Sequence, residues 1–100
     1  MSGFEEKKTE ETRQIEELLR KHFSEADCYR QNPGSIRVRI VDHRFLKLCR
    51  IEREELVYPL LDRLPEETQL DITMLLLLAP SELDSSMLNL EFEDPVPSVV

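Results

Sequence analysis

The segment IRVRIV at residues 36–41 constrains the fold more than any other, because large apolar side chains alternate in it with arginines. Successive side chains of a strand point to opposite faces, so this alternation predicts a half-buried strand. The four preceding residues, Asn32-Pro33-Gly34-Ser35, are a strong turn signal. We therefore expect a hairpin in which a short edge strand at residues 27–31 pairs with this strand.

Helical spacing of apolar residues predicts one helix over about residues 9–24 and another over about residues 51–63. Pro59 lies late in the second helix, where it removes a backbone donor and predicts a kink or break. The run ITMLLLL at residues 72–78 has the length of a strand, although its leucines also suit a helix. Its brevity, and its bounding by an acid and a proline, favour a buried strand that is covered on both faces or central in a sheet.

The elements follow the order α-β-β-α-α-β-α, since LPEE at residues 64–67 indicates a break and a new first turn. This order predicts one small α+β domain with a three-stranded mixed sheet and helices on one face. We expect residues 1–8 to be a flexible N-terminus, residues 9–87 to form the domain, and residues 88–100 to be an acidic, proline-containing tail. Such a tail can fold back as an edge strand, add to a partner's sheet as a linear peptide, or stay disordered.

Charge is distributed unevenly along the chain, whose net charge is −8. Residues 30–50 contain six basic side chains and one acidic side chain, whereas residues 51–100 contain two basic and twelve acidic ones. The basic residues form a candidate binding face: Arg30, Arg37, Arg39, Arg44, Lys47 and Arg50. This face is either a solvated sheet surface that pairs with the acidic half of the chain, or a patch that meets an acidic protein or a nucleic acid.

Cysteine usage and hydropathy point to a soluble protein of the cytoplasm. Cys28 and Cys49 have no metal-binding spacing, so we expect two free thiols in a reducing compartment. The first twenty residues are rich in Glu and Lys and contain no apolar signal segment. The longest apolar run is far too short to span a bilayer.

Read in order, these motifs resemble the BolA family, whose fold is the KH-like fold of the second type. The resemblance covers about residues 12–84, and its matching positions are Phe45 in the loop, Arg53 in the helix, the pair Val57-Tyr58, and Ala79-Pro80-Ser81-Glu82 at the final cap. It implies a small binding or regulatory domain, and a glutaredoxin-like protein as a partner.

The sequence departs from the family pattern at the positions that bind metal or an iron–sulfur cluster. Glu54 stands where the family has its helix histidine, and Asp71 falls near the histidine that opens the last strand. The long loop between the first two strands is reduced to residues 32–35, and Lys47 occupies the position of the loop glycine. We therefore expect no cofactor, no metal and no iron–sulfur ligation by this chain.

Other residue groups carry weaker signals. Glu54 and Glu55 lie about 100° apart on a helix, so they cannot easily converge on one site. His22 falls on the apolar stripe of the first helix, which predicts a partly buried histidine at the edge of the core. His43 and Cys49 are the residues that a small enzyme or metal carrier would use, but no known enzyme motif is present.

The sequence therefore predicts a non-enzymatic binding module, and specifically a protein–protein adaptor. The alternative is a KH-like regulator that binds nucleic acid through the basic face. The absence of a GxxG loop and the net charge of −8 count against that alternative.

Overall fold

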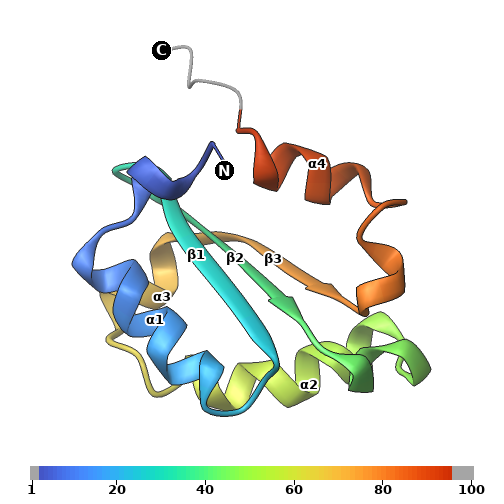
Figure 1. Ribbon diagram of the computed structural model, residues 1–100. Coiled ribbons are helices and arrows are strands. Elements are labelled where there is room, and N and C mark those ends of the chain that lie inside the picture. The colour runs from blue at the N-terminus through green and yellow to red at the C-terminus, as the bar shows by residue number, and fades with distance from the viewer. Residues whose placement is uncertain (1–2, 96–100) are drawn as a thin grey trace.

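The computed structural model describes residues 3–95, and it has the predicted α+β fold with a three-stranded mixed sheet (Figure 1). The main elements are α1 (Glu10–Arg20), β1 (Glu25–Asn32), β2 (Ser35–Val41), α2 (Arg50–Leu61), α3 (Glu66–Asp71), β3 (Ile72–Leu78) and α4 (Met87–Glu93). Short 3₁₀ helices are η1 (Glu5–Lys7), η2 (His43–Lys47) and η3 (Pro80–Glu82). The predicted order α-β-β-α-α-β-α is confirmed.

The predicted hairpin joins β1 and β2, which pair in the antiparallel sense with Asn32 opposite Ser35. The Asn32 side chain stabilises the turn, because its Oδ1 accepts a hydrogen bond from the Gly34 N–H at 3.0 Å. The first strand is longer than expected, since it runs from Glu25 to Asn32. Its register places Tyr29 opposite Arg37, and Arg30 opposite Ile36.

The leucine-rich run is a strand, as predicted, and it pairs with β2 in the parallel sense. It is not central, however, because the strand order is β1-β2-β3 and β2 lies in the middle. Leu76, Leu77 and Leu78 are buried, whereas Thr73 at the start of the strand is exposed. Both faces of β3 are therefore covered near its C-terminal end, while one edge has no neighbouring strand within residues 3–95.

The main core lies between one face of the sheet and helices α1 and α2, where it buries residues such as Ile15, Leu19, Val38, Ile40 and Val57. Thr9 caps α1, because its side chain accepts a hydrogen bond from the Thr12 N–H. The helix ends at Arg20, earlier than predicted. His22 consequently lies in the turn after the helix and is exposed, so its predicted place at the edge of the core is wrong.

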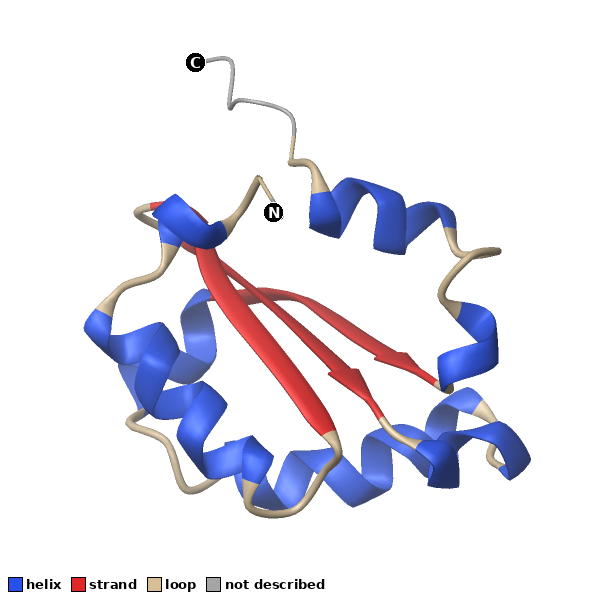
Figure 2. Ribbon diagram, viewed as in Figure 1, coloured by secondary structure: helices blue, strands red, loops and turns tan. Residues whose placement is uncertain are grey.

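Helix α4 lies against the opposite face of the sheet, so helices do not cover one face alone (Figure 2). Phe92 of this helix packs with Phe4 and Tyr29 in a second, smaller core. Within the N-terminal segment that was expected to be flexible, Glu5–Lys7 form η1 and Phe4 is only 2% exposed. Residues 88–93, expected in a tail, are helical, and the part of that tail at residues 96–100 lies outside the described residues.

Helix α2 continues through Pro59 and ends at Leu61, so the expected break does not occur there. Its apolar stripe is narrower than predicted. Val57, Leu60 and Leu61 are buried, but Ile51 is 66% exposed. Helix α2 therefore presents apolar side chains to solvent as well as to the core.

Candidate functional site

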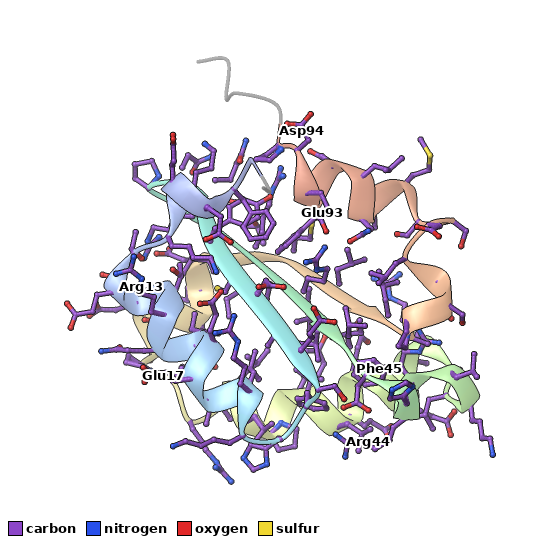
Figure 3. All side chains as sticks on the ribbon, viewed as in Figure 1. Arg13, Glu17, Arg44, Phe45, Glu93 and Asp94 are labelled. Carbon is purple, nitrogen blue, oxygen red and sulfur yellow. The ribbon has the colours of Figure 1, made fainter. Side chains whose placement is uncertain are left out.

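Two of the six candidate basic residues lie beneath α4 and are paired with acidic side chains. Arg39 is buried, and it donates hydrogen bonds to Asp27 at 2.9 Å, Asn89 at 2.7 Å and Glu93 at 2.5 Å. Burial alone would lower the pKa of Arg39, but the hydrogen bonds to Glu93 and Asp27 outweigh it and raise the pKa. Glu93 lies on the last turn of α4 in Figure 3. The neighbouring Arg37 pairs with Glu91 of the same helix at 3.1 Å.

The other candidate basic residues are scattered. Arg30 lies on the opposite face of the sheet from Arg37, where it pairs with Asp71 at 3.0 Å. Arg44 bonds to the Asp42 carboxylate and lines one hollow together with Lys47, whereas Arg50 is exposed at the start of α2. The structure therefore does not bring the six together on one exposed surface.

The two positions equivalent to family ligands also lie apart. Glu54 is half-buried on α2 and lies 3.6 Å from Arg50, whereas Asp71 ends α3 and pairs with Arg30. His43 and Cys49 are both exposed. Within residues 3–95, no three His, Cys, Asp or Glu side chains are grouped as a metal ion would require.

The outer edge of β1 is covered by charged side chains of α1, which lies beside this strand (Figure 1). The Glu16 carboxylate accepts a hydrogen bond from the Cys28 N–H at 2.9 Å, and Arg20 donates one to the Ala26 carbonyl at 2.9 Å. Lys8 in turn donates to Glu16 at 2.8 Å. Backbone groups of an uncovered edge are available to another chain, so these contacts close the β1 edge.

The outer edge of β3 has much less protection. Arg53 donates a hydrogen bond to the Leu77 carbonyl at 2.9 Å and is itself held by Glu82. The Leu78 carbonyl points the other way, toward β2, and accepts from the Asp42 N–H. Because backbone groups alternate in direction along a strand, Leu75 presents its N–H and carbonyl to the same open edge as Leu77. No hydrogen-bond partner covers those two groups of Leu75 in the described part of the chain.

A groove runs along this edge between β3 and α2. It consists of two adjoining hollows of about 470 Å³ and 330 Å³. Both hollows are lined by Arg50, Glu54 and Leu75, so these three residues mark the middle of the groove. We call this site, the open edge of β3 with the groove beside it, the β3 edge.

Exposed apolar side chains flank the β3 edge on both sides. Tyr58 of α2 lines one hollow and is 49% exposed, and Leu88 of α4 lines the other and is 52% exposed. Ile51 precedes Glu54 by one helical turn and Tyr58 by two, so it lies on the same side of α2. Exposed apolar side chains gathered beside an unpaired strand edge are typical of a protein contact.

Sequence reasoning missed this site, although it placed several of its residues. The sequence analysis compared Glu54 with a ligand position of the BolA family, assigned Arg50 to the basic face and assigned Leu88 to the tail. The signal that could have raised the question is the run at residues 72–78, which contains no lysine or proline to blunt an edge. The sequence does not predict the strand order β1-β2-β3, which places this run at the edge of the sheet.

Comparisons with models of known protein families, with curated proteins and with solved structures found no match for this chain. None of the helices within residues 3–95 has the length and apolar character that crossing a bilayer requires. Fold and site together define a small α+β protein whose sheet, within residues 3–95, has one closed edge and one open edge.

Proposed function

We propose that this chain is a non-enzymatic protein-binding module, a divergent adaptor of BolA-like type, and that the β3 edge is its contact site. The observation that supports the proposal most is the difference between the two edges of the sheet. Charged side chains of α1 bond to backbone groups of β1, whereas Leu75 on β3 keeps its outward groups unpaired in residues 3–95. An extended segment of a partner can add to such an edge through backbone hydrogen bonds.

The side chains around the β3 edge fit this role. The groove supplies apolar pockets for alternate side chains of an added strand, and Arg50 and Glu54 supply one charge of each sign. Backbone pairing provides affinity in this mode of binding, and the pockets provide specificity. No cofactor takes part in the proposed role, and no reaction is assigned to the chain.

The alternative, a KH-like regulator that binds nucleic acid, has weaker support. A phosphate backbone that approached Arg37 or Arg39 would have to displace Glu91, Glu93 and Asp27. Phosphate contacts also depend on net positive charge, and this chain has a net charge of −8. We therefore retain protein as the partner class, with a glutaredoxin-like protein suggested by family resemblance alone.

Peptide selection tests the proposal without assuming a particular partner. Random peptides displayed on phage are selected against the full chain, and enriched peptides are measured by calorimetry and by NMR shifts of the backbone amides. We expect shifts that centre on residues 72–78. A double variant, Tyr58→Lys with Leu88→Lys, should weaken binding at least about tenfold, because it places charge on both apolar flanks of the groove.

Leu46→Lys is the matched control, because Leu46 is an exposed leucine that does not line the groove. It should leave peptide binding unchanged. Peptides that bind the double variant as tightly as the wild type would contradict the proposal. Saturable binding of single-stranded RNA or DNA, lost in Lys47→Glu, would replace it with the nucleic-acid alternative.

A further inference from the structure

We propose that the β3 edge accepts a second copy of this chain, so that two β3 strands pair in the antiparallel sense and form one six-stranded sheet. The inference rests on the proposed function, since it names the partner for the same site. Closed two-fold dimers are the commonest oligomers of soluble proteins, and they require a surface that complements itself. The β3 edge meets that requirement in its backbone, its charges and its apolar side chains.

The backbone pattern allows a symmetric pairing around Leu75. With the two-fold axis perpendicular to the sheet at this residue, Leu75 of each copy donates its N–H to the Leu75 carbonyl of the other. The same register places Thr73 of each copy opposite Leu77 of the other, at the point where the pairing of β3 with β2 shifts by one residue. The hydrogen bond from Arg53 to the Leu77 carbonyl does not block this register, because a carbonyl oxygen has two lone pairs. The Arg53 side chain nevertheless occupies the edge at Leu77, so the paired stretch ends before Leu78.

The charges in the middle of the groove are self-complementary. Arg50 and Glu54 are four residues apart on α2, and both lie level with Leu75. Helix α2 runs antiparallel to β3, since its first residues lie beside the end of the strand and Tyr58 lies beside its start. A two-fold axis at Leu75 therefore places Arg50 of each copy opposite Glu54 of the other. An unrelated peptide has no reason to carry this matching pair.

Apolar side chains beyond the strand also favour a second copy over a lone peptide. An added peptide strand would cover the backbone of β3, but it would leave the flanking helices in water. A second copy brings its own α2 and α4 to the contact. Ile51 and Tyr58 on one side of the sheet, and Leu88 on the other, would then be covered by side chains of the second copy.

Charge-swapped variants test the inference by analytical ultracentrifugation of the full chain. We expect the wild type to show a monomer–dimer equilibrium between about 1 µM and 1 mM protein. Arg50→Glu places like charges opposite Glu54 of the partner copy, and Glu54→Arg does the same opposite Arg50. Each variant alone should weaken dimerisation at least about tenfold.

An equimolar mixture of Arg50→Glu and Glu54→Arg should dimerise again, to within about threefold of the wild-type affinity, because both cross-pairs become attractive. A variant that merely misfolded could not be rescued in this way. The matched control is Arg13→Glu mixed with Glu17→Arg, a pair with the same spacing and charges that projects from α1 (Figure 3). These two variants should dimerise like the wild type, both alone and in the mixture.

A wild-type chain that stays monomeric over the whole range would overturn the inference, and so would a mixture that fails to dimerise when the wild type does. The peptide selection separates this failure from that of the proposed function. A monomeric chain whose amides at residues 72–78 still shift with selected peptides would refute the dimer alone. A monomeric chain that binds no peptide at this edge would refute both.

Discussion

The Glu16 carboxylate of α1 accepts a hydrogen bond of 2.9 Å from the backbone N–H of Cys28 on the outer edge of β1. Glu16 is only 3% exposed, and Lys8 neutralises it from the other side at 2.8 Å. A buried carboxylate is costly unless it is paired and hydrogen-bonded, and here both conditions are met. The sheet thus uses a buried charge to close one edge. On the other edge Arg53 covers the Leu77 carbonyl, but the outward groups of Leu75 have no partner in residues 3–95.

Replacing Glu16 by Ala should lower the free energy of unfolding by about 2–3 kcal/mol, because it leaves the Cys28 N–H without its partner and removes the shortest ion pair of Lys8. The measurement is urea-induced unfolding followed by circular dichroism. Glu17→Ala is the control, since Glu17 is exposed on the same helix, and it should change stability by less than about 0.5 kcal/mol. Equal effects of the two substitutions would show that the cap contributes nothing.

Arg39→Met should destabilise the protein by about 3 kcal/mol, because it removes the shared partner of Asp27, Asn89 and Glu93. The guanidinium also lies 4.7 Å from the centre of the Phe92 ring, so its loss weakens the packing of α4 against the sheet. Hydrogen exchange should therefore become faster first in residues 87–93. Exchange that accelerates uniformly along the chain would argue against a local role of Arg39 in holding α4.

The two thiols should differ sharply in reactivity. Burial raises the pKa of the Cys28 thiol, and the nearby Glu16 carboxylate raises it further, so little thiolate forms there. Cys49 is exposed at the start of α2. A thiol reagent should modify one cysteine in the native protein and two in denaturant, and Cys49→Ser should abolish the native reaction. Labelling of Cys28 in the folded chain would contradict the burial.

Asp42 should make stability depend on pH in the acid range. The Arg44 side chain, together with the backbone N–H groups of Arg44 and Ser24, holds the pKa of Asp42 well below its usual range. Because the folded pKa lies below the unfolded one, ionised Asp42 stabilises the fold above about pH 4, and this contribution is lost as the pH falls further.

Asp42→Asn should therefore lower stability by about 2 kcal/mol at neutral pH, and the difference from wild type should shrink below about pH 4. Urea unfolding over a pH series measures the effect, with Asp84→Asn as an exposed control. A difference that persists unchanged at the acid end of the series would show that the charge of Asp42 is not what stabilises the fold.

Local patterns in the sequence determined the elements of this protein. The alternation in residues 36–41 identified β2, because strand geometry alone sends successive side chains to opposite faces. Residues 72–78 were recognisable as a strand from their length and boundaries. Ile15 and Leu19 were placed on the buried stripe of α1 by their spacing, and both are fully buried. Such signals need only the chain's own periodicity.

Contacts between distant segments decided what the elements do, and no local pattern contains them. Arg37 and Arg39 were placed on one strand face, but only the fold shows that Glu91 and Glu93, more than fifty residues away, pair with them. The same leucine run would be a buried central strand or an open edge, depending on where α1 and β1 lie. Strand order depends on how the whole chain packs, so only the tertiary structure could leave Leu75 at an unpaired edge.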